Sequence, residues 1–376
     1  MTAKRTIRKF AGIAGLALAG GVVGVFVGKG VAAQGWLRDS LDVLSAWDLL
    51  VLPLAWLLVI AVHEGGHLAG GLSRGMRFLL MIIGPLGWVR AGERIEFRLY
   101  FNLGTLGGVA AAMPVPDRPL LPQLRRLVVG GPLASLLLAV LCAAVFVFAE
   151  GRTSAYALIT GLLSALIFVA TAVPMRAGGF MSDGMQFLQL SRDPAMVERR
   201  AHLIGLVGMS LAGRRPRELD PELLAQTQAL AGDEPLFDVG VWQYSAHHAW
   251  DQGDLDAAGT WLDRIANVFD QYPDGFRQSV AVELALHAAW HRRDLATAEE
   301  WLARAKGGVV DATRRALAEA AVAQLKGDAA KAATALATAR RKLAHGMDPG
   351  VARLSADQIE ALQSRTADTR QGPPSA

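Results

Sequence analysis

The sequence predicts a mainly α-helical membrane protein: a polytopic bundle of about four transmembrane helices, followed by a soluble α-helical repeat domain. The first observation is composition, because 52% of the 376 residues are hydrophobic and only 19% are charged, whereas soluble domains carry roughly 25% charged residues. The second is the distribution of charge, since residues 1–212 have a net charge of +8 and residues 213–376 one of −4. The single cysteine, Cys142, excludes a disulfide-linked scaffold.

Four apolar stretches reach the roughly 20 residues that a helix needs to cross a bilayer. They are Phe10–Gly28, Leu49–Ser73, Leu127–Ala149 and Thr153–Met175. The last two are separated by three residues, so they are expected to pair as antiparallel helices. The first follows a basic segment, as a signal peptide does, but its apolar run exceeds the usual core of roughly 7–15 residues, which favours an uncleaved helix.

Lysine and arginine give the orientation. If the N-terminus lies in the cytoplasm, 16 of the 19 Lys and Arg residues in the first 212 lie on the cytoplasmic side. This asymmetry predicts a multi-pass protein whose N- and C-termini are both cytoplasmic and whose surroundings are the lipid bilayer. Because these residues flank apolar spans, topology accounts for them, and no nucleic-acid partner is expected.

A membrane-associated β-hairpin is predicted between the second and third spans. Its second strand, Ile95–Leu99, alternates apolar and charged side chains with a period of two. Its first strand contains Trp88 and Arg90, and a turn at Ala91–Glu93 joins the two. The following Gly-rich run, Leu103–Met113, is uncharged but too short to span, which predicts a re-entrant segment.

The second span carries the residues that predict a chemistry. His63 and His67 are four residues apart, so both imidazoles project from one face of a helix and can bind one metal ion. Glu64 lies beside the first histidine and can take a proton from a water molecule that zinc activates. A carboxylate inside an apolar span costs about 2.5–3.5 kcal/mol on insertion scales, so it is usually paired or functional. The pattern therefore predicts a zinc site with Glu64 as general base and acid.

The third ligand that catalytic zinc requires is left open by the spacing. Asp183 follows the fourth span and has glycines before and after it, which would let the chain fold back. An equally good interpretation makes Ser182 or Asp183 the N-cap of a helix over Gly184–Leu190. Glu93 and Glu96 are further candidates, although both are expected to pair with the arginines of the hairpin.

Three sequence blocks resemble, in order, the site-2 protease family of intramembrane zinc metalloproteases, and more narrowly a bacterial branch of it. The blocks are His63-Glu64-Gly65-Gly66-His67, Gly131-Pro132-Leu133-Ala134-Ser135 and Ser182-Asp183-Gly184. The resemblance implies that His63, His67 and Asp183 are zinc ligands and that Glu64 is the catalytic residue. It also implies a hairpin that holds the substrate strand in extended form. The residues expected to bind substrate are Trp88, Arg90, Ile95, Phe97 and Ser135.

The function that this resemblance implies is an intramembrane zinc metalloendopeptidase of the bacterial inner membrane, which hydrolyses peptide bonds of membrane-protein substrates. Its cofactor would be Zn²⁺. The alternative is a catalytically inactive, protease-like anchor that presents the helical repeats as an adaptor for protein–protein interaction. A zinc transporter would require more polar residues along the other spans, which have almost none.

From residue 213 the sequence becomes rich in Ala, Asp and Arg and contains internal repeats. Ala249–Leu255 recurs 40 residues later as Ala289–Leu295, and a third copy follows at Leu325–Ala329. This spacing predicts tetratricopeptide-like helix pairs. Because such arrays usually present a concave surface to a peptide or protein, a cytoplasmic protein partner is a hypothesis for this domain. The tryptophans expected to pack between its helices are Trp242, Trp250, Trp261, Trp290 and Trp301.

The predicted organisation has four parts. A first span and loop occupy residues 1–45, the protease-like domain 46–212, the cytoplasmic repeat domain 213–368 and a disordered tail 369–376. Within the repeats, Glu283, His287 and His291 would suit a second metal site by their spacing. A repeat helix whose polar face carries two histidines is the simpler interpretation.

Overall fold

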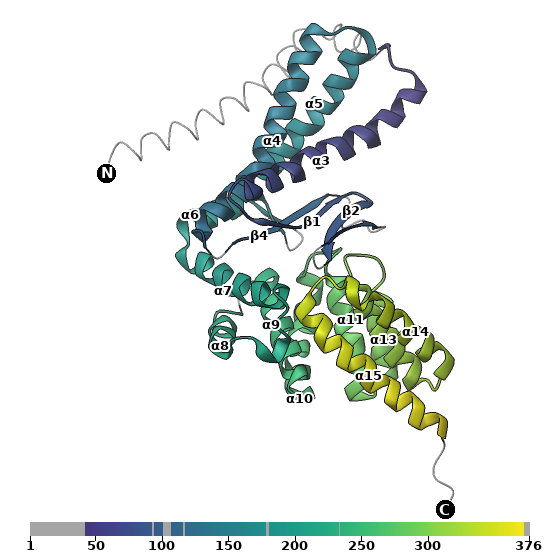
Figure 1. Ribbon diagram of the computed structural model, residues 1–376. Helices are drawn as coiled ribbons and strands as arrows, with labels where there is room; N and C mark the ends of the chain where they lie inside the picture. Colours follow the sequence, from purple (N-terminus) through teal and green to yellow (C-terminus); the bar gives the residue numbers. More distant parts are fainter. Residues whose placement is uncertain are drawn as a thin grey trace, which may run out of the picture. The chain divides into compact units, whose positions relative to one another are not determined.

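A computed structural model of the chain describes residues 42–91, 94–100, 107–115, 117–177, 180–232 and 234–371 (Figure 1). The chain divides into two compact units, which are treated in turn. Of the described residues, the first unit comprises 42–77, 110–175 and 181–191, and the second unit contains the others. The first predicted span, Phe10–Gly28, and the tail after residue 371 lie outside the described residues.

In the described part of the first unit, three helices are long and apolar enough to cross a membrane, and they correspond to the second, third and fourth predicted spans. They are α3 (Val51–Leu72), which continues the short helix η1 (Ala46–Leu50), α4 (Leu120–Phe148) and α5 (Gly151–Ala172). Large apolar side chains on them stay exposed, among them Leu137 and Leu141. Such surfaces suit contact with lipid chains, which are as apolar as leucine.

Helices α3 and α4 cross so closely that both require glycine. A Cβ built on Gly66 would lie 2.4 Å from the carbonyl oxygen of Gly130, and one built on Gly130 would lie 2.0 Å from that of Gly66. Small residues at a crossing let two backbones touch, and this packing supplies the attraction that the hydrophobic effect cannot provide within lipid. The crossing therefore fixes the histidine-bearing helix against α4.

A four-stranded sheet follows α3 in the chain, with the strand order β3-β2-β1-β4. Its strands are β1 (Arg77–Ile83), β2 (Leu86–Ala91), β3 (Arg94–Leu99) and β4 (Val109–Met113). Strands β2 and β3 pair in antiparallel register with Trp88 opposite Phe97, which confirms the predicted hairpin.

The sheet has two strands that the sequence did not predict. Strand β1 is a continuous apolar run, a pattern that does not distinguish a strand from a buried helix segment. The prediction of a re-entrant segment over Leu103–Met113 is wrong for its last five residues. Val109–Met113 form β4, an edge strand of the sheet. Pairing with a neighbouring strand satisfies its backbone groups, which a re-entrant loop would leave to other partners. Residues 101–106 lie outside the described part.

Strands β5 (Arg176–Ala177) and β6 (Phe180–Met181) form a separate two-stranded sheet. The rest of the described second unit is mainly helical. The helices are α7 (Pro194–Leu211), α8 (Pro221–Ala229), α9 (Pro235–Asp251), α10 (Leu255–Val268), α11 (Arg277–His287), α12 (Leu295–Arg304), α13 (Ala312–Leu325), α14 (Ala329–Lys342) and α15 (Pro349–Gln371). Helix α11 continues into a π-helical turn, η5 (Ala288–Arg292). Helix α15 extends three residues past the predicted domain end at 368.

The repeated aspartate of each sequence copy starts a helix. Asp254, Asp294 and Asp328 each accept a hydrogen bond from a backbone N–H at the first turn of α10, α12 and α14. These side chains satisfy donors that a helix start otherwise leaves free. Each capped helix packs against the helix before it, so the three copies correspond to three helix pairs.

The tryptophans pack as predicted. Trp242, Trp250 and Trp290 are buried in the core of the helical region, and Trp261 and Trp301 pack against that core while partly exposed. The rings of Trp250 and Trp290 meet edge to face, with centroids 5.8 Å apart. Equivalent positions of two repeats thus contact each other, which ties neighbouring helix pairs together.

One turn departs from the other two repeats. Gly253 and Gly327 have φ of +88° and +79° before their capping aspartates, whereas the equivalent Arg293 has φ of +55°. A residue with a Cβ pays roughly 1 kcal/mol or more for this conformation, and glycine does not. We therefore expect Arg293→Gly to raise the free energy of unfolding by about 0.5–1 kcal/mol, measured by urea unfolding followed through tryptophan fluorescence. Gly253→Arg is the matched control and should lower it; equal stability of both variants and the wild type would refute the argument.

Candidate metal centre

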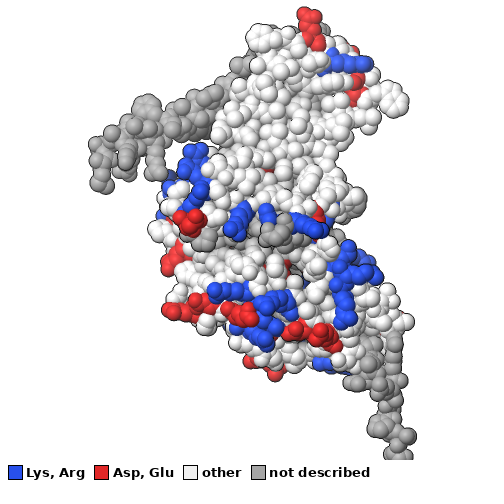
Figure 2. Space-filling model, viewed as in Figure 1, with Lys and Arg blue, Asp and Glu red and all other residues white. Residues whose placement is uncertain are grey.

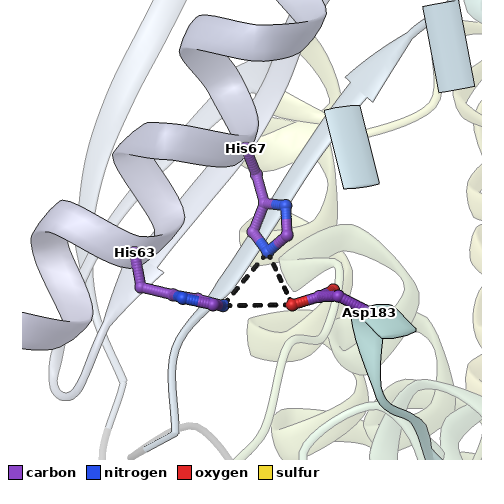
Figure 3. A group of neighbouring side chains, drawn as sticks. All are labelled: His63, His67 and Asp183. Carbon is purple, nitrogen blue, oxygen red and sulfur yellow. Dashed lines mark hydrogen bonds and ion pairs between the residues drawn. The ribbon is translucent and has the colours of Figure 1, made fainter. Parts of the chain in front are cut away.

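Two histidines and an aspartate converge in the first unit (Figure 3). His63 and His67 project from one face of α3, with their Nε2 atoms 3.2 Å apart. The Oδ2 atom of Asp183 lies 3.3 Å from Nε2 of His63 and 3.4 Å from Nε2 of His67. The three side chains offer ligand atoms that all lie within 4.8 Å of one another. Among the described residues, they form the group of His, Cys, Asp or Glu side chains that could hold a metal ion.

Asp183 reaches the histidines because the preceding serine caps the helix. Helix α6 (Asp183–Arg192) begins at Asp183, and the hydroxyl of Ser182 accepts a hydrogen bond of 3.2 Å from the N–H of Met185. The same hydroxyl donates to the carbonyl of Val173, 2.7 Å away, which ties the helix start to the end of α5. Of the two interpretations left open by the sequence, the N-cap belongs to Ser182, and the carboxylate of Asp183 is left to the histidines.

Glycines make room for this arrangement. A Cβ on Gly131 would lie 2.3 Å from Nε2 of His67, so the imidazole occupies the space that a side chain on α4 would fill. A Cβ on Gly184 would lie 1.9 Å from the carbonyl oxygen of Ala172, so α6 could not start against the end of α5 with a larger residue. Both glycines stand in the motif blocks, and their role is steric.

The outer nitrogen of each imidazole is held by a neighbour. Nδ1 of His63 lies 2.9 Å from the hydroxyl of Ser135, and Nδ1 of His67 lies 2.8 Å from the carbonyl oxygen of Leu127. These contacts turn both Nε2 atoms toward Asp183, as partners of metal-binding histidines usually do. The sequence predicted that Ser135 binds substrate. In the structure it is fully buried, and its hydroxyl contacts His63, which was not predicted.

Two imidazole nitrogens and a carboxylate oxygen are the donor set of a catalytic zinc site. Burial alone would raise the pKa of Asp183, but hydrogen bonds with His63 and His67 hold it below the ordinary value. An ionised carboxylate and two oriented imidazoles fit a divalent cation. The residues present therefore fit zinc.

Glu64 is buried beside this group without belonging to it. The backbone of Ala110, the second residue of β4, lies next to its carboxylate. An edge strand of the sheet therefore touches the residue expected to act as base and acid. The sequence could not indicate this contact, because Val109–Met113 has no alternating pattern and its partner lies far away in the chain.

The remaining predicted substrate-binding residues lie in the second unit, on β2 and β3. The rings of Trp88 and Phe97 contact each other across the two strands, with centroids 5.6 Å apart. Arg90 donates a hydrogen bond of 2.8 Å to the carbonyl of Phe78. Ile95 and Phe97 are more than half exposed on β3, the other edge strand.

The other candidate ligands are engaged elsewhere or not described. Glu96 pairs with Arg98 at 2.9 Å, as predicted, and Glu93 lies outside the described residues. Nε2 of His287 lies 2.9 Å from the carbonyl of Leu255, and Nε2 of His291 lies 2.7 Å from Asp256. These two histidines have different hydrogen-bond partners, and the structural interpretation of them stays a prediction.

Comparison with known proteins gives one result that covers most of the chain. The model of Peptidase family M50 matches residues 51–352. The match includes α3, the sheet, α4 to α6 and most of the C-terminal helices. No curated protein and no solved structure matches the chain.

Proposed function

The chain belongs to peptidase family M50, and from this membership we propose that it is an intramembrane zinc metalloendopeptidase acting on membrane-protein substrates. The observation that carries the proposal is the convergence of His63, His67 and Asp183 beside Glu64, next to the crossing of two candidate membrane helices. A site built from α3, α4 and α6 suits hydrolysis of a bond that lies at the membrane.

His63, His67 and Asp183 would hold the metal. Zinc bound there would supply a Lewis acid that polarises a peptide carbonyl and makes water acidic near neutral pH. Glu64 takes the proton from the attacking water and passes it to the leaving nitrogen, which requires a base that is close to the ligands but not itself a ligand. Ser135 and the carbonyl of Leu127 keep the imidazoles oriented throughout. Burial of His63 and Glu64 limits access of bulk water to the reacting bond.

Substrate would bind in extended form along an edge of the sheet. A strand at an edge offers unpaired N–H and C=O groups that a peptide can complete as an added strand. The sequence predicted that the substrate strand binds to the hairpin of β2 and β3, whose free edge is β3. Contact between Ala110 and Glu64 favours β4 instead, because a peptide along β4 passes next to the base.

The two edges can be distinguished by cross-linking. We expect a substrate with a single cysteine near its cleavage site to form a disulfide with an Ala111→Cys variant and not with a Phe97→Cys variant, both in a Cys142→Ser, Glu64→Gln background. The measurement is a mobility shift on a non-reducing gel. Cross-linking to the Phe97→Cys variant alone would return the substrate strand to β3.

The experiment that tests the proposed function is cleavage in reconstituted membranes. Wild-type protein in proteoliposomes, with a panel of single-span membrane proteins as substrates, should cut at least one; a zinc chelator should stop the reaction and added zinc restore it. A metal-loaded, well-folded protein that cuts none of them would favour the inactive-anchor alternative.

The orientation and the C-terminal region complete the proposal. The excess of Lys and Arg on one side of the spans supports cytoplasmic termini in a bacterial inner membrane. The three helix pairs with aspartate caps support a tetratricopeptide-like domain that recruits a cytoplasmic protein. Figure 2 shows broad stretches of surface without charged side chains and others where Lys, Arg, Asp and Glu gather, which is consistent with a chain that faces both lipid and water.

A further inference from the structure

A hollow in the first unit lies beside the end of α3 and the start of α4. Its volume is about 520 Å³, within the roughly 300–1,000 Å³ that is usual for small-ligand sites. It is lined by residues of the turn after α3 and of the segment before α4, namely Gly75, Arg77, Val115, Asp117 and Arg118. None of these residues belongs to the metal centre, so the hollow calls for a separate explanation.

The guanidinium of Arg118 is held in place at this hollow. Its Nη1 atom donates a hydrogen bond of 3.0 Å to the carbonyl oxygen of Arg74. A Cβ built on Gly75 would lie 2.7 Å from the same Nη1, so the guanidinium occupies space that glycine leaves free. A guanidinium has five N–H donors, and the described residues engage one of them. Arg118 is therefore oriented by the protein and keeps donors for a ligand.

A buried glutamine holds the segment that contributes Val115 and Arg118. The side chain of Gln123, which is 1% exposed, accepts a hydrogen bond of 2.9 Å from the N–H of Val115 and donates one of 3.0 Å to its carbonyl. The same amide nitrogen donates to the carbonyl of Arg118, 3.0 Å away. A buried polar group whose hydrogen bonds are satisfied rigidifies the chain around it. This side of the hollow is therefore preformed.

The charge of the lining decides which ligand fits. The guanidiniums of Arg77 and Arg118 and the carboxylate of Asp117 give the hollow a net charge of +1. Arg77 is exposed and has no hydrogen bond or ion pair with any described residue. Guanidiniums bind phosphate oxygens through paired N–H groups, and a charge of +1 complements a single phosphodiester. Asp117 disfavours a more highly charged phosphate ion and can accept a hydrogen bond from a hydroxyl group of the ligand.

The position of the hollow identifies the source of the phosphate. Both α3 and α4 are candidate membrane helices, and Leu72, three residues before Gly75, exposes an apolar side chain that can contact an acyl chain. Basic pockets beside the ends of membrane helices bind the headgroups of anionic lipids. We propose that the hollow binds the headgroup of phosphatidylglycerol, whose phosphate contacts Arg77 and Arg118 while a glycerol hydroxyl donates to Asp117.

The test compares two lipids that share a phosphate. Full-length protein in detergent, stripped of lipid, is mixed with phosphatidylglycerol and phosphatidylcholine of equal acyl chains, and bound lipid is measured by native mass spectrometry. Phosphatidylcholine adds a positive trimethylammonium group and has no hydrogen-bond donor, so phosphatidylglycerol is expected to bind about tenfold more tightly or better. Arg118→Gln removes the oriented guanidinium and should weaken its binding about tenfold. Glycerol 1-phosphate at millimolar concentration represents a free phosphate and should not displace the lipid.

Arg126→Gln is the matched control. Arg126 is exposed near the start of α4, and a Cβ built on Gly70 of α3 would lie 2.1 Å from its carbonyl oxygen, but it does not line the hollow. The variant removes the same charge near the same helix ends, so it should weaken phosphatidylglycerol binding less than about twofold. This comparison separates a built site from the general attraction of basic residues for anionic lipid.

A further variant keeps the test informative if Arg118→Gln does not fold. Arg77→Gln removes no contact with a described residue, so it should fold and weaken phosphatidylglycerol binding about fivefold. Equal binding of the two lipids, equal loss in Arg77→Gln, Arg118→Gln and Arg126→Gln, or displacement by glycerol 1-phosphate would each overturn the proposal. Because no residue of the metal centre lines the hollow, Glu64→Gln protein should bind the lipid as the wild type does, whatever its proteolytic activity.

Discussion

Glu64→Gln is expected to lower the rate of substrate cleavage by about 10³-fold or more while the protein keeps its zinc. The magnitude is that of losing a positioned general base and acid. The substituted glutamine would retain the size and the hydrogen-bonding oxygen of glutamate, so the contact with the backbone of Ala110 can persist. The glutamine amide cannot accept a proton from water, and this is the single chemical difference that matters. Cleavage of a reconstituted substrate and metal content are measured on the same preparation.

A matched acid elsewhere supplies the control for this result. Glu150, in the turn between α4 and α5, is exposed and lies outside the metal centre, so Glu150→Gln should cleave at the wild-type rate. Substantial cleavage by well-folded Glu64→Gln protein would remove Glu64 from the mechanism. Loss of zinc in that variant would instead assign Glu64 a structural role in holding α3 against β4.

His67→Ala and Asp183→Ala are each expected to lose zinc, from about one ion per chain in the wild type to less than about a tenth of that. Each variant leaves two of three protein ligands, and catalytic zinc sites are built from three. The metal is measured by mass spectrometry after gel filtration in detergent. A structural role would affect folding rather than metal, so thermal unfolding of each variant is recorded alongside.

Ser135→Ala separates the ligands from the group that orients one of them. It removes the hydroxyl that holds Nδ1 of His63 and leaves all three ligands in place, so zinc affinity should fall about 10–100-fold rather than vanish. If Asp183→Ala keeps its zinc fully and His67→Ala loses it, the two histidines are ligands and a residue other than Asp183 is the third. Unchanged affinity in Ser135→Ala would show that the packing of α3 alone orients His63.

The parts of the site that could be predicted from the sequence are those determined by short-range geometry. Two histidines four residues apart share a helix face whatever surrounds the helix, so their convergence required no tertiary information. Asp183 was harder, because both a cap and a ligand were open to it. The decision lies in a hydrogen bond of Ser182 to the end of α5, which is a contact between segments that no local pattern encodes.

Long-range pairing accounts for what the sequence could not reveal. The apolar run of β1 is compatible with a strand or with a buried helix segment. The small residues of β4 are compatible with a loop, and only the pairing with β1 makes them a strand. The contact of Ala110 with Glu64 depends on that pairing. In the C-terminal region the sequence predicted the repeated helix pairs, but not that the repeated aspartates cap helices. The pairing of Glu283 with Arg314 joins two helices and was not predicted either.

The glycines at the crossing of α3 and α4 and at the start of α6 have a consequence for recognising relatives of this chain. Positions 66, 130, 131 and 184 exclude a Cβ because a carbonyl oxygen, an imidazole or a helix end already occupies the space. A sequence that keeps His63, Glu64, His67 and Asp183 but carries a larger residue at any of these four places cannot close the same metal centre without moving a helix. Glycine at these four positions therefore distinguishes chains that can assemble the metal centre from chains that only keep its ligand residues.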